Sequence, residues 1–195
     1  MGLEKGNGDA RTAPELRTER LWLRGWRPGD LEAFCRLNAD PEVMRYFPRV
    51  LTEEESRAEA ARIAAHFERH AFGVWAVEIP GVGEHAGFVG ISVPAFEAHF
   101  TPCVEIGWRL APEYWGRGFA TEAARAVLEF GFGRLGLEEI VAFTVPANTR
   151  SRRVMEKLGM RCRPEDDFDH PRIAEGSPMR RHVLYRISRG EWRGD

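Results

Sequence analysis

The stretch CVEIGWRLAPEYWGRGFAT, residues 103–121, constrains the fold more than any other part of the chain. Apolar and polar side chains alternate over residues 104–110, which predicts a strand that ends before Pro112. Gly116 and Gly118 then allow a tight turn whose backbone can approach a ligand closely. A helix is expected directly after the turn, and the unpaired N–H groups of its first turn favour an anion such as a phosphate.

Two common phosphate-binding fingerprints do not match this turn, because it contains neither G-x-G-x-x-G nor Gly-Lys-Ser/Thr. The turn resembles instead the pyrophosphate-binding loop of the GNAT acetyltransferases, which reads Gln/Arg-x-x-Gly-x-Gly/Ala. Gly118 and Ala120 match this pattern, while Trp115 stands where Gln or Arg is common. The adjoining EIGW (105–108) and YWG (114–116) are similar to the branch that includes the ribosomal-protein N-terminal acetyltransferases.

The order of the expected elements agrees with this resemblance. We expect strands at 16–26, 74–79, 88–93, 104–110 and 140–145, a closing hairpin of 161–163 with 182–187, and helices after Asp30, after a capping box at Thr52, after Gly118 and after Asn148. The resemblance, over about residues 16 to 190, implies the α/β (α+β) GNAT fold. That fold has a mixed sheet of about seven strands, splayed between the fourth and the fifth, and about four helices. We predict a flexible tail over 1–15 and one acetyltransferase domain over 16–195.

Composition excludes several other classes of protein. The chain has 195 residues of which 43% are hydrophobic, enough for a full core. Its net charge of −2 provides no general attraction to nucleic acids or anionic membranes, so neither is an expected partner. Cys35, Cys103 and Cys162 are scattered and form no C-x-x-C, which predicts a reducing cytoplasmic location without a disulfide or metal framework. Neither a signal peptide nor a membrane span is expected.

The resemblance implies an acetyl-CoA-dependent N-acetyltransferase. The acceptor would be a primary amine, on a protein N-terminus or a small molecule, and transfer would be direct, through a tetrahedral intermediate. Backbone N–H groups of 116–121 would hold the pyrophosphate, and the edge of the 104–110 strand would hold the pantetheine arm. The N–H of Leu110 or a neighbour would polarise the thioester carbonyl. The alternative from another class is a non-catalytic acyl-CoA-binding module of the same fold.

By this resemblance a set of residues is expected to contact the cofactor: Trp108, Arg109, Leu110, Trp115, Gly116, Arg117, Gly118, Phe119, Ala120, Thr121, Asn148, Ser151 and Arg153. The structural alternative for the glycine turn is an ordinary connection between a strand and a helix.

Glu105 is the candidate general base. It lies on a strand that is predicted to be buried, and burial would raise the pKa of its carboxyl towards a useful value. The alternative is a structural salt bridge with Arg109, which lies on the same face of the strand, or with another arginine. The sequence leaves both open.

Ser151 is the candidate general acid. Many GNAT enzymes place a Tyr seven residues after the Asn of this helix, but Met155 occupies that position here and cannot donate a proton. In the ribosomal branch a Ser three residues after the Asn has this role, and Ser151 matches it. It is also the one polar member of an apolar helical stripe. The alternative is that Asn148 and Ser151 only cap the helix.

The sequence indicates less about the acceptor side, the part of the site that would bind the acceptor amine. Aromatic residues of the 44–48 segment and three aspartates of the 166–171 loop would flank it, and the carboxylates would suit an amine unless they are merely solvated. His66 and His70 read as helix-surface residues, and no metal is predicted. Exposed tryptophans, Trp22, Trp26 and Trp192, would allow a homodimer.

Overall fold

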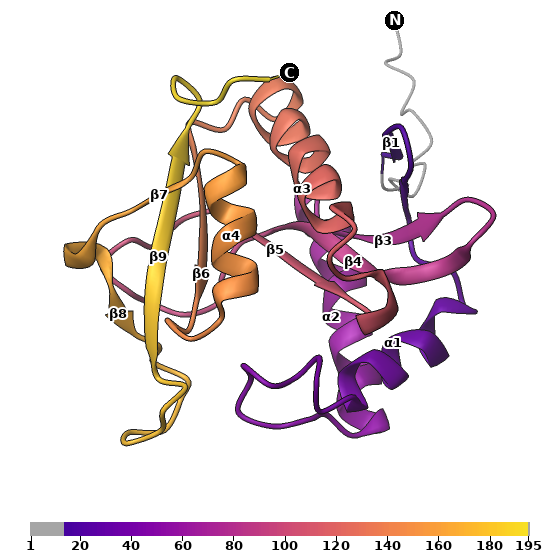
Figure 1. The fold of residues 1–195 in the computed structure, drawn as a ribbon, viewed down its shortest axis with the longest axis horizontal. Helices are drawn as coiled ribbons and strands as arrows, with labels where there is room; N and C mark the ends of the chain where they lie inside the picture. Colours follow the sequence, from indigo (N-terminus) through magenta and orange to yellow (C-terminus); the bar gives the residue numbers. More distant parts are fainter. Residues whose placement is uncertain (1–13, 195) are drawn as a thin grey trace, which may run out of the picture.

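The computed structural model describes residues 14–194, and the predicted tail therefore lies almost entirely outside the described residues. One mixed sheet of nine strands runs through them in the order β1-β2-β3-β4-β5-β6-β9-β7, with β8 paired to β9 (Figure 1). The strands are β1 (Leu16–Arg17), β2 (Trp22–Arg24), β3 (Val74–Ile79), β4 (Gly83–Ser92), β5 (Glu105–Leu110), β6 (Glu139–Thr144), β7 (Arg161–Cys162), β8 (Phe168–Asp169) and β9 (Arg181–Ser188).

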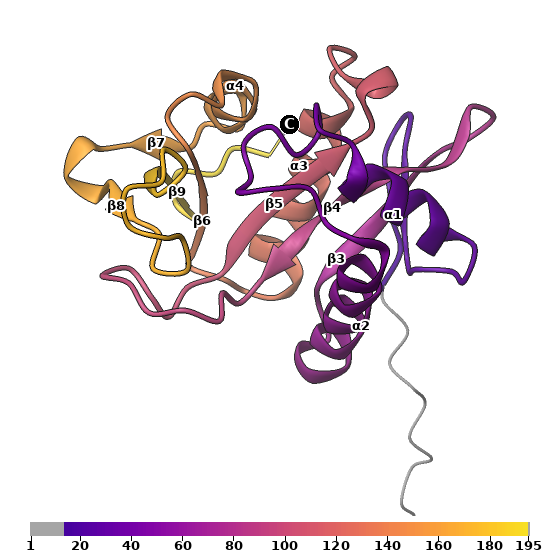
Figure 2. The same cartoon turned by 90° about the horizontal axis from the view of Figure 1, so that it is seen from below.

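Four α-helices accompany this sheet in the described chain: α1 (Asp30–Ala39), α2 (Glu53–His70), α3 (Phe119–Glu129) and α4 (Thr149–Lys157). α3 continues into a π-helical turn at Phe130–Arg134, and short 3₁₀ turns lie at Pro112–Tyr114 and Pro164–Asp166. The predicted α/β class and the order of its elements are confirmed. α3 packs on β4 and β5 and touches α4, while α1 packs on β4 and on α2 (Figure 2).

The two halves of the sheet separate between β5 and β6. β5 pairs antiparallel with β4 along its whole length, but it meets β6 in parallel at one position only, where Glu105 is opposite Val141. Figure 1 shows the two strands diverging from there. The splay predicted between the fourth and fifth strands, residues 104–110 and 140–145, therefore lies where the sequence places it. It leaves an opening in the middle of the sheet.

The faces of β5 divide as its alternation predicts. Ile106 and Leu110 are buried in the main core together with residues of α3. Arg109 lies on the opposite face, where its guanidinium donates a hydrogen bond to Asn38 of α1. Because side chains alternate along a strand, Glu105 and Gly107 share this second face, on the side of α1.

Some boundaries differ from the sequence prediction. The expected strand 16–26 is split into β1 and β2 by a turn in which Thr18 Oγ1 accepts a hydrogen bond from the N–H of Leu21 (3.0 Å). α2 has the predicted capping box at Thr52 and Glu55, and its C-terminal cap is Ala71, although the sequence favours Gly73 as the residue that ends this helix. Ala71 adopts the left-handed conformation (φ 60°), because its N–H closes the helix onto the carbonyl of Phe67.

An Asp at the start of a helix commonly caps it, but the side chain of Asp30 does not cap α1. Its carboxylate instead forms a bidentate pair with Arg24, at 2.7 and 2.8 Å, and both side chains are almost completely buried. Glu78 of β3 accepts a third hydrogen bond from Arg24 (2.7 Å). This buried network fixes α1 against the edge of the sheet, and the local helix-start signal could not reveal it.

Candidate active site

The glycine turn presents a row of unpaired backbone donors. Gly116 and Gly118 have positive φ angles of 72° and 84°, and Gly118 directly precedes α3. Within the described chain, no backbone or side-chain acceptor takes the N–H groups of residues 116–121. Consecutive free N–H groups at a helix N-terminus are suited to an anion, so the geometry fits a pyrophosphate.

The turn is held from outside by the segment before β2. Arg20 donates to the carbonyl of Arg117 (3.1 Å) and to the carboxylate of Glu122 in the first turn of α3 (2.7 Å). Thr18 also donates to Glu122 (2.6 Å). Burial would raise the pKa of Glu122, but the hydrogen bonds from Thr18 and Arg20 lower it below its usual value. The carboxylate near the anion site is thus neutralised by Arg20.

Trp115, at the position where the family pattern has Gln or Arg, has two contacts of its own. Its indole Nε1 donates to the carbonyl of Leu110 at the end of β5 (2.7 Å). The guanidinium of Arg150 on α4 lies over the indole ring, 4.5 Å from its centroid, and Arg150 also reaches Glu42 in the loop after α1 (3.7 Å). Trp115 therefore joins the turn both to β5 and to the helix across the splay.

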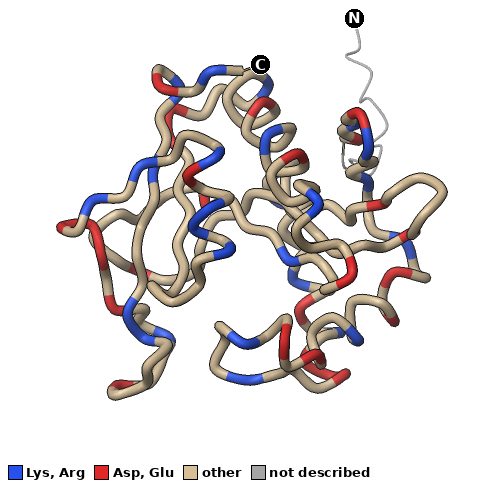
Figure 3. The backbone as a smooth tube through the Cα atoms, viewed as in Figure 1, with Lys and Arg blue, Asp and Glu red and all other residues tan. Residues whose placement is uncertain are grey.

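A cavity of about 360 Å³ adjoins the turn. Gly118, Thr121, Arg125 and Lys157 contribute to its lining, with Glu19 and Glu122. Figure 3 shows basic residues in blue along α4, the helix that contributes Lys157. Arg153 of the same helix is exposed. Basic side chains of α3 and α4 therefore lie next to the free N–H groups, together with the carboxylates of Glu19 and Glu122.

The edge of β5 that faces the opening carries unpaired backbone groups. The N–H of Val141 donates to the carbonyl of Val104 (2.9 Å), which shows that the backbone of Val104 points towards β6. Backbone groups alternate along a strand, so those of Ile106 and Trp108 point the same way. The N–H of Ile106 still belongs to the pairing with Val141, and the groups of Trp108 and the N–H of Leu110 lie beyond it. No described strand pairs with them there. The Trp108 side chain itself is half-buried against the core.

Glu105 lies at the last position where β5 and β6 still pair. Its side chain is half-buried, and burial raises the pKa of its carboxyl to about 8. Within residues 14–194 it forms no ion pair, whereas Arg109 bonds to Asn38. The salt bridge between Glu105 and Arg109 that the sequence left open is therefore absent from the described structure. A carboxyl with this pKa can accept a proton near neutral pH.

Asn148 and Ser151 are close together at the start of α4. Asn148 caps the helix by accepting from the N–H of Ser151 (3.2 Å), and its amide donates to the Ser151 hydroxyl (3.1 Å) and to Thr144 (3.0 Å). The Ser151 oxygen is thus an acceptor in this pair, which leaves its own proton available. Met155 is buried in the core. The capping role of Asn148 is confirmed, and it also orients the hydroxyl of Ser151.

Cys103 is the cysteine nearest to this site in sequence, two residues before Glu105. Burial, followed by the charge of Glu105, raises the pKa of its thiol to about 11. A thiol with that pKa is almost entirely protonated near pH 7 and is a poor nucleophile. Cys103 is therefore not suited to carry an acetyl group.

The predicted acceptor side differs from expectation in its charges. Asp166 pairs with Arg186, Asp167 with Arg181, and Asp169 with Arg180 and Arg181. The three carboxylates are therefore already compensated by arginines and do not form an acidic patch for an amine. From the 44–48 segment, Phe47 is the aromatic ring left exposed (40%), and it lies over the guanidinium of Arg109 (4.3 Å).

The three tryptophans offered as exposed are half-buried. Trp26 and Trp192 pack against the main core, and Trp22 lies under the guanidinium groups of Arg17 and Arg27. The argument for a homodimer from exposed tryptophans is thus wrong. The described part of the chain has no helix that is long and apolar enough to span a membrane.

Sequence reasoning missed the roles of Arg20 and Glu122, and it considered Arg150 for a phosphate contact without foreseeing its contact with Trp115. Arg20 and Glu122 are about a hundred residues apart, so no local pattern links them. Arg150 stands in an ordinary run of arginines, and its contact with Trp115 depends on how α4 crosses the splay. The acidic residue in the first turn of α3 was the one available signal, and it is equally explained by the helix dipole.

Comparisons with known proteins identify a family that this chain matches. A family model described as an acetyltransferase (GNAT) domain matches residues 20–161. An uncharacterised N-acetyltransferase of Bacillus subtilis is 32% identical over 91% of this chain and 98% of its own length. The FsC-acetyl coenzyme A-N(2)-transacetylase of Aspergillus fumigatus is 33% identical over 92% of this chain and 78% of its own.

Solved structures extend this agreement to the fold. The crystal structure of a GNAT-family acetyltransferase from Bacillus anthracis superposes with a TM-score of 0.74 and 32% identity, over 91% of this chain and all of that one. The ribosomal L7/L12 α-N-protein acetyltransferase in complex with coenzyme A gives a TM-score of 0.71 at 15% identity, over 90% and 98% of the two chains. At that identity the likeness concerns the fold alone.

Proposed function

The chain belongs to the GNAT family of N-acetyltransferases, and from this membership we propose that it transfers the acetyl group of acetyl-CoA directly to a primary amine. The observation that carries the proposal is the combination of a row of free N–H groups at 116–121 with an opening in the sheet that has Glu105 at its head. The acceptor is an amine on a small molecule or on a protein N-terminus.

The residues present fit acetyl-CoA. The N–H groups of 116–121 would bind the pyrophosphate, and the basic side chains around the adjacent cavity would surround the nucleotide. The unpaired edge of β5 offers backbone partners to the two amides of a pantetheine arm. Bound in this way, acetyl-CoA supplies a thioester as the acetyl donor. The chain itself supplies orientation, hydrogen bonds and proton transfer.

Glu105 and Ser151 would handle the protons. The amine nitrogen bonds to the acetyl carbon to give a tetrahedral intermediate, and the bond from that carbon to sulfur breaks as the intermediate collapses. Glu105 accepts the proton that the amine loses, directly or through a water, and the backbone edge of β5 donates to the carbonyl oxygen as it gains charge. Ser151 gives its proton to the departing thiolate, with Asn148 holding its hydroxyl in place. The high pKa of Cys103 supports direct transfer rather than an acetylated cysteine.

The test is thiol release from acetyl-CoA with a panel of small amines and N-terminal peptides, alongside coenzyme A binding by calorimetry. We expect turnover with at least one acceptor class. S151A should lower kcat about 10-fold or more without weakening coenzyme A, because it removes a proton donor that acts after binding. T149A is the matched control, since Thr149 is exposed on the same turn of α4, and it should retain the wild-type rate.

A non-catalytic module that only binds acyl-CoA is the alternative. It would give tight coenzyme A binding and no thiol release with any acceptor. The absence of the usual Tyr at Met155 is the observation in its favour, whereas the unpaired Glu105 with its raised pKa favours the enzyme. A cytoplasmic location, where thiols remain reduced, fits the three free cysteines and is part of the proposal.

A further inference from the structure

Arg109 carries a charge that the described protein does not neutralise. Its side chain is half-buried on the face of β5 that it shares with Glu105. Its hydrogen-bond partner is the neutral amide oxygen of Asn38, and its Nε is shielded from water without any partner. No carboxylate of the described chain lies within ion-pair distance, and desolvation lowers the pKa of Arg109 to about 10. Its charge is therefore held at a cost in free energy.

Two other arginines that are shielded from water form ion pairs with carboxylates. Arg24 is paired with both Asp30 and Glu78, and Arg186 is paired with both Asp166 and Glu139. The carboxylate of Glu59 acts on Arg109 only from beyond ion-pair distance, and it forms its own ion pair with Arg62. Among the described residues, Arg109 thus differs from Arg24 and Arg186 in having no carboxylate partner, and it lies in the candidate active site.

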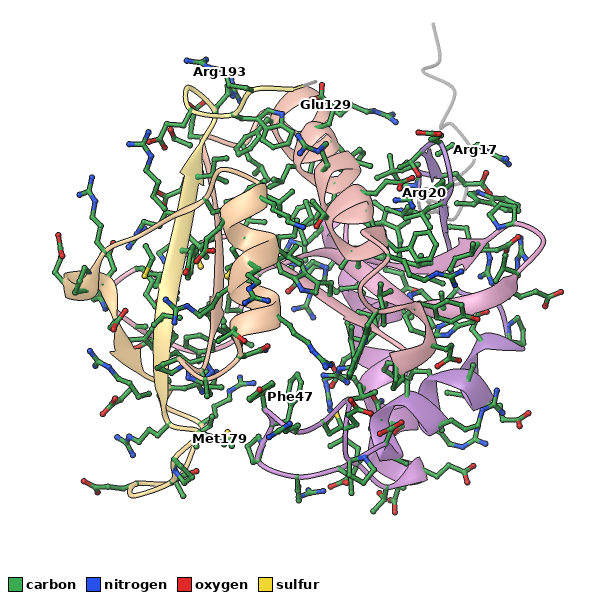
Figure 4. All side chains as sticks on the ribbon, in the orientation of Figure 1. Arg17, Arg20, Phe47, Glu129, Met179 and Arg193 are labelled. Atoms are coloured by element: carbon green, nitrogen blue, oxygen red, sulfur yellow. The ribbon has the colours of Figure 1, made fainter. Side chains whose placement is uncertain are left out.

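The surroundings of Arg109 hold it in one orientation. Its guanidinium lies between the rings of Phe47 (4.3 Å) and Phe88 (5.1 Å). Asn38 is completely buried and is itself fixed by a hydrogen bond to Ser56 (3.2 Å). Figure 4 labels Phe47 on the loop between α1 and α2, and its ring is exposed. The guanidinium is thus held in place next to a ring at the surface.

We propose that the acceptor amine carries an anionic group, a carboxylate, and that this carboxylate binds Arg109 while the amine lies at Glu105. The inference rests on the proposed function, since it concerns the acceptor of that reaction. Glu105 and Arg109 are four residues apart on one strand, so their Cα atoms are about 13 Å apart. The substrate class is therefore an amino acid or a short peptide-like molecule whose amine and carboxylate are several bonds apart.

The physical reason is complementarity of charge. A planar guanidinium fixed between two rings has free donors that match the two oxygens of a carboxylate. A carboxylate on the acceptor would supply the negative charge that no described residue provides to Arg109. A neutral amine of the same length would leave the charge of Arg109 uncompensated when it is bound. The carboxylate acceptor would therefore bind more tightly than the neutral one, which makes the enzyme specific for it.

The experiment compares matched acceptors. β-Alanine, γ-aminobutyrate, 6-aminohexanoate and a Gly-Gly dipeptide are each tested against their own carboxamide, with thiol release from acetyl-CoA as the readout. The wild-type protein should have a value of kcat/KM about 10- to 100-fold higher for the carboxylate in at least one pair, as expected for a hydrogen-bonded charge pair. The ratio within a pair cancels any effect on cofactor binding that the two acceptors share.

Variants locate the source of the preference. In R109Q the ratio should fall to within about twofold of unity, and in R109K, which retains the charge without the planar fork, it should be intermediate. R45Q removes an exposed arginine from the neighbouring loop, and it should preserve the wild-type ratio. Acetate and propionate should also compete with the carboxylate acceptor in the wild-type protein, which tests the site without any substitution.

The outcomes separate this inference from the function on which it rests. Thiol release with carboxamides equal to that with carboxylates overturns the inference alone, as does an unchanged ratio in R109Q together with weaker coenzyme A binding. Coenzyme A binding without thiol release from any acceptor overturns the proposed function and the inference together. A carboxylate preference that is lost in R109Q, and retained in R45Q, supports both.

Discussion

The guanidinium carbon of Arg150 lies 4.5 Å from the centroid of the Trp115 indole ring. Arg150 belongs to α4, on the far side of the splay, and Trp115 belongs to the turn that follows β5. Because the indole also donates to the carbonyl of Leu110, this one stack joins the strand, the turn and the helix around the opening. β5 and β6 pair at a single position, so few backbone hydrogen bonds hold the two halves of the sheet together here. A side-chain contact between the halves therefore contributes a larger share of what joins them.

A double-mutant cycle of W115L and R150Q measures that stack. We expect a coupling free energy of about 0.5–1 kcal/mol in urea unfolding, the usual range for a partly exposed cation over an aromatic ring. R150Q alone also removes the 3.7 Å contact with Glu42, which is exposed and should contribute little. Additive effects of the two substitutions would show that the stack does not stabilise the fold.

The pH dependence of activity tests the role of Glu105. A base works only when deprotonated, and the pKa of Glu105 is raised to about 8, so kcat/KM should rise with pH through about 8 and then level off. E105Q should lower kcat by about 100-fold or more and lose this limb, with coenzyme A affinity retained. E138Q is the control, because Glu138 pairs with Arg189 on the surface. A profile in E105Q parallel to that of the wild type would exclude Glu105 as the base.

The contribution of Glu105 to stability should depend on pH in the opposite sense to that of most carboxylates. A folded pKa above the unfolded value of 4.5 means that the folded state holds the proton more tightly between about pH 4.5 and 8. The wild type should therefore lose stability relative to E105Q as pH rises through this window, by more than about 1 kcal/mol. Urea unfolding at pH 5 and pH 9 measures this, and equal differences at both would contradict it.

The glycine turn can be tested with G116A. A Cβ at Gly116 would meet no atom within 4 Å, so its cost comes from the positive φ of 72°, about 1 kcal/mol. The same Cβ would stand next to the free N–H groups and should weaken coenzyme A binding by about 10-fold or more. Gly190 also has open space around it but no positive φ, and G190A should change neither quantity. Undiminished coenzyme A affinity in G116A would count against the turn as the anion site.

The buried network at Arg24 predicts a large loss of stability. D30A would leave Arg24 with Glu78 alone and should cost about 3–5 kcal/mol, measured by thermal or urea unfolding. Burial would raise the pKa of Asp30, but hydrogen bonds from Arg24 and Arg27 hold it below 3.8. The stabilisation is thus present above the unfolded pKa and is lost as the pH falls through the lower folded value. A loss of unfolding free energy below about 1 kcal/mol would mean that Glu78 alone is enough to compensate the charge of Arg24.

Patterns within short stretches of sequence predicted the parts of this site that are formed by residues close together in the chain. The strand at 104–110, the glycine turn and the cap at Asn148 depend on periodicity and on glycine within a few residues, and each is found in the structure. The split of the first strand was missed because Thr18 fixes a turn inside an apparently continuous alternation.

Pairing between distant charges could not be predicted. The aspartates at 166, 167 and 169 read as a free acidic loop, yet each meets an arginine of β9 or the loop before it. His66 read as a surface residue, but its ring bonds to the carbonyl of Phe72 and to the N–H of Val93. In the same way Arg109 and Glu105 looked like partners on one face, and only the structure shows that Asn38 takes the guanidinium.

The opening between β5 and β6 gives this enzyme two strand edges in the middle of its own sheet. Edges at the rim of a sheet are commonly guarded by charge, by bulges or by covering loops, because an unpaired row of amides attracts any extended peptide. Here the guard would be the donor itself, whose pantetheine arm lies along the edge that a foreign strand would occupy. Where nothing lies along them, these edges can pair with an extended segment of another chain, so a ligand in the opening would also protect the sheet from wrong pairing.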